Sequence, residues 1–260
     1  MAMVVIDTVD VHWIRETRHA ELSGDSSTLM LAGETRRRET RTYREADYLI
    51  AVSDVDRKNL ESIAPGIPVE VIALVAPVHC GARRFESRRD LAFIENFAHK
   101  PNPDAVEFFI SEIFPAVRRR IDSRLLLVGK DTENAMVGYS SSSIIVVGRV
   151  AETFKYLRQV KMLIAPIRFG SGIKGKIAEA LAAGTPVVTT SVGSEGMELR
   201  DGSTALIRDT PQAFAEAIVS VYTDEGVWDT LSCNGRKHAE QQYSRKHVLS
   251  VLRRCISLGR

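Results

Sequence analysis

The chain has 260 residues, of which 44% are hydrophobic and 26% are charged. This composition is that of an ordinary globular protein, with enough apolar residues for one large domain or two small ones. A formal net charge of +2 gives no indication of nucleic acid as a partner. Three cysteines without CxxC spacing argue against a disulfide framework or a zinc site and favour a reducing cytoplasm. We expect no signal peptide and no membrane span, which takes roughly 18 apolar residues.

Residues 1–75 contain three short apolar runs that predict strands, at 4–6, 48–52 and 69–74. A single βαβ unit takes about 30 residues or more, so three strands make only part of a Rossmann-like domain. We therefore expect either a fragment of a longer polypeptide or a naturally shortened chain.

The same part carries the sequence RRRETRTYR at 36–44. On a helix this run forms a strongly basic face. Such a face is either a solvated surface or a contact with an anionic acceptor or a membrane surface, in which case the protein touches the membrane peripherally.

The segment at 76–90 is polar, rich in glycine, proline and arginine, and without periodicity, which predicts a linker. Six further strands are predicted after it, at 91–94, 124–129, 143–148, 162–167, 185–190 and 204–207. Their runs are apolar without alternation, as expected of parallel strands covered on both faces. Amphipathic stretches such as 103–120 lie between them. This alternation predicts an α/β fold with a doubly wound parallel sheet.

The stretch at 167–190 is the richest in chemistry. A strand ends at Ile167, a loop with three glycines follows, and a helix is predicted from about Ile173 to Ala183. Glycines let backbone N–H groups approach a ligand closely, and a helix amino end carries unpaired donors and about half a positive charge. Three cations stand beside this loop: Arg168, Lys174 and Lys176. The combination predicts a phosphate site at the carboxyl edge of a parallel sheet.

Two other interpretations of this loop exist. Gly170 to Lys176 fits the GxxxxGK pattern of a P-loop, but Ile177 stands where a P-loop has the hydroxyl that holds Mg²⁺. No later strand ends in an obvious metal-binding aspartate, so a P-loop NTPase is disfavoured. The other interpretation is a glycine-rich turn with surface lysines.

The segment resembles the diagnostic region of the glycosyl transferases group 1, the family-four retaining enzymes of the GT-B fold. The family pattern is roughly R-x-G-x-G-x-x-x-K-x-x-E-A-x-A-x-G-x-P-V-V, and it is met by Arg168, Gly170, Gly172, Lys176, Glu179, Ala180, Ala182, Gly184, Pro186, Val187 and Val188. Other stretches resemble the family in the same order along the chain: 93–109, 125–131, 144–150 and 191–207 on the donor side, and 7–16 and 46–61 on the acceptor side. The first part of the family's acceptor domain has no counterpart here.

The resemblance implies a GT-B-like fold. A partial acceptor-side Rossmann-like domain at 1–75 precedes one complete Rossmann-like donor domain at 91–245, and a C-terminal helix at 246–260 follows the donor domain. It also implies retaining transfer of a sugar from a nucleoside diphosphate sugar to a glycan, lipid or small-molecule acceptor. No cofactor and no metal are expected, because protein cations neutralise the leaving diphosphate. Preorganised charges and N–H donors favour the state in which that negative charge has developed.

The residues that the resemblance places in the site have two kinds of role. Catalytic roles are expected for His12, Arg168 and Lys176, and donor-binding roles for Gly148, Arg149, Val150, Gly170, Ser171, Gly172, Lys174 and Glu179. Glu179 would accept hydrogen bonds from the ribose hydroxyls about two turns into its helix, and the backbone of residues 148–150 would meet the base. A lone histidine after a strand, as at His12, is often structural instead.

Two positions depart from the family. Many relatives carry two glutamates eight positions apart, and the first position falls on Ser171, so the usual carboxylate near the donor sugar is missing. Relatives often have a glycine where Glu95 stands and a basic residue near Asn96. A carboxylate at Glu95 would repel a diphosphate if it faced the site. His99 or Lys100 is a candidate to replace the missing charge, as are Arg168 and Lys176.

The alternative function is a nucleotide-sugar-binding module that is inactive alone and completed by a missing segment or an oligomer partner. A sugar-nucleotide epimerase of the same fold would need catalytic carboxylates and a histidine that the sequence does not assign. The expected partners are a nucleotide sugar and a glycan or lipid-linked acceptor, and no nucleic acid. The C-terminal helix either crosses back to the acceptor side or docks on its own domain.

Overall fold

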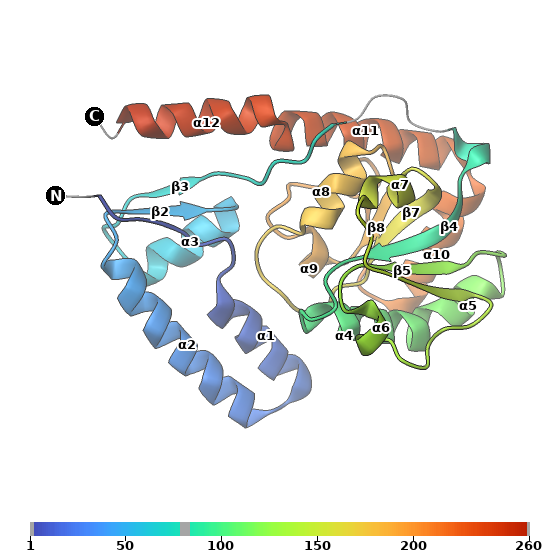
Figure 1. The fold of residues 1–260 in the computed structure, drawn as a ribbon, viewed down its shortest axis with the longest axis horizontal. Coiled ribbons are helices and arrows are strands. Elements are labelled where there is room, and N and C mark those ends of the chain that lie inside the picture. The colour runs from blue at the N-terminus through green and yellow to red at the C-terminus, as the bar shows by residue number, and fades with distance from the viewer. Residues whose placement is uncertain (1–2, 79–83, 259–260) are drawn as a thin grey trace.

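The computed structural model describes residues 3–78 and 84–258, and it contains two separate parallel β-sheets (Figure 1). The first sheet has three strands in the order β1-β2-β3, and the second has six in the order β6-β5-β4-β7-β8-β9. The predicted α/β, GT-B-like fold class is confirmed, and all nine predicted strands are present. Among the described helices, none is long and apolar enough to cross a membrane.

The N-terminal part is a small three-layered unit. Its elements are β1 (Val5–Asp7), α1 (His12–Ser23), α2 (Ser26–Arg44), β2 (Tyr48–Ala51), α3 (Asp54–Ile63) and β3 (Val69–Val71). The carboxylate of Asp25 caps α2 by accepting a hydrogen bond from Ser27 N, and the hydroxyl of Ser53 caps α3 by accepting one from Asp56 N. Its own core includes Leu49, Leu60 and other buried residues of these elements.

The C-terminal part holds the larger sheet and most of the helices. A 3₁₀ turn (Phe85–Ser87) leads into β4 (Arg89–Ile94), α4 (Pro101–Phe108), a π-helical turn (Phe109–Ile113), α5 (Phe114–Arg118), β5 (Leu125–Val128), α6 (Thr132–Ala135), β6 (Ile144–Gly148), α7 (Thr153–Leu157), β7 (Val160–Ala165), α8 (Gly175–Ala182), β8 (Val187–Thr189), α9 (Ser191–Ser194), β9 (Leu206–Ile207), α10 (Pro211–Thr223), α11 (Glu225–Tyr243) and α12 (Arg245–Leu258). α5 and α10 pack together on one side of the sheet, and α8 and α11 pack together on the other (Figure 1).

Strand order explains why the β-strands of this sheet are apolar throughout. β4 pairs with β5 on one side and with β7 on the other, and every residue of β7 is buried. Parallel strands with helices on both faces have no solvated face, so alternation is lost. The resulting core is continuous and much larger than the N-terminal one.

The helix predicted at 103–120 is interrupted. α4 ends at Phe108, a π-helical turn follows, and α5 ends at Arg118. Pro115 has no N–H to bond the carbonyl of the preceding turn, and Phe114 N instead donates to Phe109 O. The proline therefore accounts for the break that amphipathic periodicity did not reveal.

The chain passes twice between the two parts. The first connection follows β3, inside the predicted linker at 76–90, of which residues 79–83 lie outside the described residues. The second is the step from α11 into α12, which runs back toward the N-terminal side of the molecule (Figure 1). The two connections are joined where Ala76 N donates to Tyr243 O at 2.9 Å.

Candidate functional site

The strand order defines where a ligand fits. From β4 the chain moves to β5 and β6 on one side, and from β7 it moves to β8 and β9 on the other, while β4 and β7 are neighbours. Open α/β sheets bind ligands outside the carboxyl ends of the strands at such a switch point. A cavity of about 190 Å³ lies there, and we call it the switch-point cavity. It is lined by Val9, Asp10, Glu95, His99, Pro101, Asn102, Ile167, Phe169, Gly170, Ser171, Ile173, Lys174 and Gly175.

The glycine loop between β7 and α8 forms one wall of this cavity. Gly172 has a φ of 67°, in the left-handed region that side chains disfavour. A Cβ on Gly172 would lie 3.3 Å from the carbonyl oxygen of Val9, which belongs to the N-terminal part. Glycine at this position therefore allows both the turn and the close approach of the two parts.

The amino end of α8 opens onto the cavity. α8 begins at Gly175, and no side chain caps its first turn. The unpaired N–H groups and the helix dipole make such an end an anion site. The structure thus places Gly170, Gly172 and the first turn of α8 together, as the sequence predicted.

Lys174 lines the cavity and is largely desolvated. Its Nζ donates to Ser171 O at 3.1 Å and to Gly172 O at 2.7 Å. Burial lowers the pKa of Lys174 to about 8, against the carboxylates of Glu195 and Asp56, which raise it. The ammonium group is thus a cation held beside the glycine loop, with its charge stabilised by nearby acids.

Lys176 and Glu179 form a pair on the next turn of α8. Lys176 Nζ lies 2.6 Å from Glu179 Oε1, and Thr153 Oγ1 donates to Glu179 Oε2 at 3.0 Å. Because α8 begins at Gly175, Glu179 stands about one turn into the helix, where two turns were expected. Lys176 is not in the wall of the switch-point cavity, and its predicted catalytic role stays a prediction.

The residues predicted to meet the base end β6 and begin the following loop. Gly148 is buried, has a φ of 82°, and its O accepts from Gly129 N at 2.8 Å. Arg149 is exposed and Val150 half-buried. Thr153, which bonds Glu179, starts the helix after this loop. The loop of residues 148–150 and Glu179 are therefore neighbours, as a ribose and its base require.

Arg168 does not point into the cavity. Its guanidinium donates from Nε and Nη2 to the two carboxylate oxygens of Asp104 and lies 5.0 Å from the centre of the Phe108 ring. Both partners belong to α4. The Asp104 carboxylate thus holds this side chain outside the cavity wall, and the predicted contact of Arg168 with a diphosphate stays a prediction.

Glu95 does face the cavity. It follows β4, where many relatives have glycine, and it lines the cavity together with Lys174. Burial raises the pKa of Glu95 to about 7, while Lys176 and Lys174 lower it. The carboxyl group therefore changes its charge near neutral pH at the place where a diphosphate would lie.

His12 lies outside the cavity wall. Its side chain is 53% exposed, and its Nδ1 is 2.8 Å from Glu39 Oε1 of α2. Its Nε2 is 4.0 Å from Asp10 Oδ2. Glu39 of α2 thus holds the ring, and the predicted contact between His12 and a donor sugar stays a prediction.

Other residues of the N-terminal part reach the glycine loop instead. Ser171 Oγ donates to the Asp10 carboxylate and to Val11 O, the latter at 3.1 Å. Arg18 Nη1 donates to Gly170 O at 2.7 Å. Asp10 and Arg18 were not among the predicted site residues. Only the fold reveals them, since their partners lie more than 150 positions away.

A second hollow adjoins the switch-point cavity. This groove of about 490 Å³ lies between α1, α2 and the loop after β4, and shares His99, Pro101 and Phe169 with the cavity. Its wall includes Arg15, Glu16, His19, Arg38 and Lys100. Glu16 Oε2 is buried there without a hydrogen-bond partner among the described residues. The groove thus offers cations and a free carboxylate oxygen beside the cavity.

Two Rossmann-like parts that enclose a cavity at the switch point of the larger sheet define the GT-B class of α/β protein. The sequence pattern of one family, described as glycosyl transferases group 1, matches residues 88–224, which is more than half of the chain. The chain belongs to this family.

Known proteins agree with this placement. YtcC of Bacillus subtilis (strain 168) is 38% identical over 77 residues, which are 28% of this chain and 19% of YtcC. The capsular polysaccharide biosynthesis glycosyltransferase CapM of Staphylococcus aureus is 25% identical over 145 residues, 52% of this chain and 38% of CapM. The crystal structure of Anabaena Alr3699/HepE in complex with UDP and glucose superposes with a TM-score of 0.72 at 14% identity, covering 98% of this chain and 71% of that one. The chain therefore spans well under half the length of the two curated relatives.

Proposed function

We propose that the protein is a glycosyltransferase that moves a sugar from a nucleoside diphosphate sugar to a hydroxyl of a glycan or lipid-linked acceptor. The observation that carries the proposal is the convergence of the glycine loop, the uncapped amino end of α8 and Lys174 on the switch-point cavity. Membership of the glycosyl transferases group 1 supports it.

The donor is proposed to lie across the carboxyl edge of the sheet. Its diphosphate contacts the backbone from Gly170 to Gly175 and the ammonium of Lys174. Its ribose lies toward Glu179, and its base lies along residues 148–150. The Thr153–Glu179 hydrogen bond of 3.0 Å supports this order, because it brings the ribose and base positions together.

The chemistry that this arrangement suits is departure of a nucleoside diphosphate. Negative charge grows on the leaving phosphate as the bond to the sugar breaks. N–H groups fixed at the amino end of a helix and a desolvated lysine favour that charge without rearranging. A charge-assisted hydrogen bond contributes roughly 1.5–3 kcal/mol, so a few of them account for a large part of the leaving-group stabilisation. We propose transfer with retention and without a metal ion on this basis.

Uridine is the proposed base, and a glycan is the proposed acceptor. Alr3699/HepE has been crystallised with UDP and glucose, and CapM is named for capsular polysaccharide biosynthesis. The groove beside the cavity is the proposed acceptor site, since it opens from the end of the cavity formed by His99 and Phe169. The wall of this groove includes the carboxylate of Glu16 and the cations Arg15, Arg38 and Lys100.

A second candidate is a nucleotide-sugar-binding module that does not turn over its ligand alone. Two observations favour it. Ser171 offers a hydroxyl, already bonded to Asp10, where many relatives place a carboxylate near the donor sugar. Glu95 adds a carboxyl group to the diphosphate position.

Thermal unfolding tests donor binding. The protein is heated with UDP, GDP, dTDP or ATP, each with Mg²⁺ and with EDTA. A ligand at about 100 times its Kd stabilises by roughly 2.7 kcal/mol, and we expect UDP to do so equally in EDTA. No shift with any nucleotide, or a shift only with Mg²⁺ and ATP, would contradict the proposal.

Turnover separates the two candidates. UDP-sugars that stabilise the protein are incubated with it, and released UDP is measured with and without oligosaccharide acceptors. UDP release that depends on the acceptor supports the transferase, and the anomeric configuration of the product, read by NMR, tests retention. Tight binding without UDP release across the acceptor panel favours the binding module.

A further inference from the structure

Helix α2 presents an unusual outer face. Its buried residues Ala32, Thr35 and Tyr43 lie on one side and pack toward the N-terminal core. The helix forms the outer border of the N-terminal part, with α1 and α3 on its inner side (Figure 1). The opposite face is therefore available to a partner.

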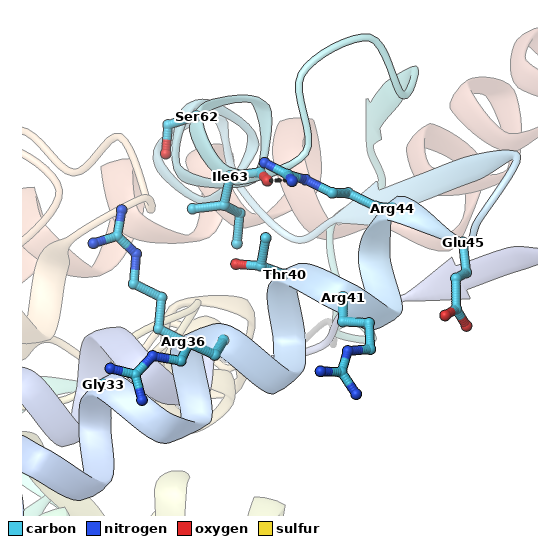
Figure 2. A pocket seen from close by; sticks show the side chains of 9 residues that line it. Gly33, Arg36, Thr40, Arg41, Arg44, Glu45, Ser62 and Ile63 are labelled. Carbon is cyan, nitrogen blue, oxygen red and sulfur yellow. Dashed lines mark hydrogen bonds between the residues drawn. The ribbon is translucent and has the colours of Figure 1, made fainter.

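The second half of α2 borders an arginine-lined groove on its side toward α3. The groove has a volume of about 820 Å³ and lies between α2 and the end of α3. In Figure 2, Ser62 and Ile63 stand opposite the helix. Its wall contains Arg36, Arg37, Arg41 and Arg44. We call these four residues the arginine row.

The arginine row is short of intramolecular acids. Arg44 Nε donates to Ile63 O at 3.1 Å, and the Arg36 guanidinium lies 4.8 Å from the centre of the Trp13 ring. Within residues 3–78 and 84–253, no ion pair involves any member of the row. Glu39 is bonded to His12, and Glu45 is the acid that lines the groove together with the row. The guanidinium groups therefore remain free to bind external anions.

The first half of the same helix exposes large apolar side chains. Leu29, Met30 and Leu31 are 51%, 73% and 59% exposed, and Leu22 at the end of α1 is 45% exposed. These four residues form the tip of the α1–α2 hairpin, and we call them the apolar tip. Clustered exposed aliphatic side chains indicate a contact surface, because their exposure to water is unfavourable.

Met30 of the tip and three arginines of the row lie along one side of α2. Met30 is followed after seven residues by Arg37, after four more by Arg41 and after three more by Arg44, which are the spacings of one helix face. At 1.5 Å per residue, Met30 and Arg37 are about 10 Å apart along the helix axis. That length matches the roughly 5–10 Å by which interfacial helices enter a bilayer.

We propose that the α1–α2 hairpin docks on an anionic lipid bilayer. The apolar tip enters the boundary between headgroups and acyl chains, and the arginine row binds lipid phosphates. Arginine suits this task because its planar fork donates two hydrogen bonds to one phosphate. A soluble polyanion would satisfy the arginines and leave the apolar tip in water, whereas a bilayer satisfies both. The proposal does not depend on the glycosyltransferase activity.

The test is co-sedimentation of the full chain with vesicles of phosphatidylcholine, alone or mixed with phosphatidylglycerol. We expect binding to the mixed vesicles that weakens with salt, because each arginine near the surface acts through a screened charge. The double variant Arg37→Glu/Arg41→Glu and the double variant Leu29→Asp/Met30→Asp should each lower the partition coefficient at least about tenfold. Thermal unfolding of each variant verifies its fold. Where the harsher changes unfold the protein, Met30→Gln replaces the tip variant and Arg37→Gln/Arg41→Gln replaces the arginine variant.

The matched control carries the same charge change elsewhere. Arg119→Glu/Arg120→Glu alters two exposed arginines beyond the end of α5, in the C-terminal part. An equal loss of vesicle binding in this control would overturn the proposal, because it would reveal a general charge effect.

Binding to soluble heparin is the second experiment. If the arginine variant loses heparin and vesicle binding alike while the tip variant keeps both, the groove binds a soluble polyanion and the bilayer is excluded.

Discussion

The guanidinium of Arg18 in α1 forms two hydrogen bonds with the carboxylate of Glu195, 177 positions later, at 2.6 and 2.8 Å. The same group donates to Gly170 O. One side chain of the N-terminal part thus fixes both the glycine loop and the acid that lies near Lys174. The position of the glycine loop therefore depends on a residue of the N-terminal part.

Replacing Arg18 tests this dependence. Arg18→Ala leaves the half-buried Glu195 carboxylate and the Gly170 carbonyl without their donor, so we expect the free energy of unfolding to fall by about 1–3 kcal/mol. Denaturant unfolding of Arg18→Ala, Glu195→Ala and the double variant gives the coupling energy. Additive effects of the two single changes would show that the ion pair contributes nothing.

Lys174 and Lys176 should affect different parts of the donor. Lys174→Met removes a cation from the diphosphate position, and we expect it to weaken both UDP and pyrophosphate binding by roughly ten- to a hundredfold. Lys176→Met removes the ion-pair partner of Glu179, which lies 2.6 Å away. This change should weaken the binding of UDP and leave the binding of pyrophosphate unchanged. Isothermal titration calorimetry with the two ligands measures both effects. An equal loss of affinity for UDP and for pyrophosphate in both variants would mean that both lysines contact phosphate.

Glu95 should make donor binding depend on pH. Burial raises the pKa of Glu95 to about 7, so the carboxyl is neutral below that pH and negatively charged above it. A negative charge in the cavity repels the diphosphate, and affinity for a UDP-sugar should fall as the pH rises from 6 to 8.

The folding stability contributed by Glu95 changes with pH in the same direction as the donor affinity. Because the folded pKa is above the ordinary value of 4.5, protonation favours the folded state, and this contribution is fully present below 4.5 and lost as the pH rises through 7. Glu95→Gln should flatten both profiles near pH 7. Lys174, with its pKa near 8, adds a later fall in donor affinity that Glu95→Gln leaves in place. An unchanged profile in Glu95→Gln would rule out this role of the carboxyl.

Gly129 should be intolerant of a side chain. It follows β5 with a φ of 145°, and a Cβ there would overlap the backbone oxygen of Glu95. We expect Gly129→Ala to lower the free energy of unfolding by more than about 3 kcal/mol. Gly138→Ala is the control, since Gly138 also has a positive φ of 86° but open space around it, and the expected cost is about 1 kcal/mol. Equal losses in the two variants would contradict the steric explanation.

The sequence predicted the strands well because each is an uninterrupted apolar run between polar segments, as at residues 162–167. It also predicted the glycine loop and the start of α8 to within two residues, because Gly170, Gly172 and Lys174 act through local backbone geometry. The alternation of strands and helices predicted a parallel sheet, whereas the strand order and the switch-point cavity are known only from the structure.

Side-chain directions could not be predicted in the same way. Arg168 was assigned to the diphosphate, but it pairs with Asp104, 64 positions earlier. His12 was assigned to the sugar, but it turns to Glu39, 27 positions later. In each case a carboxylate on a packed helix decides where the side chain points, and no local pattern encodes that partner.

The hydrogen bond between Ala76 and Tyr243 has a mechanical consequence. It joins the two chain segments that pass between the N-terminal and C-terminal parts, so both connections lie at one edge of the molecule. Two adjacent connections act as a hinge, which permits rotation about the line between them and resists sliding. The contacts of Arg18 with Gly170 and of Ser171 with Asp10 also join the two parts, at the glycine loop. Rotation about the hinge at Ala76 and Tyr243 would break these contacts and open the cavity between the two parts.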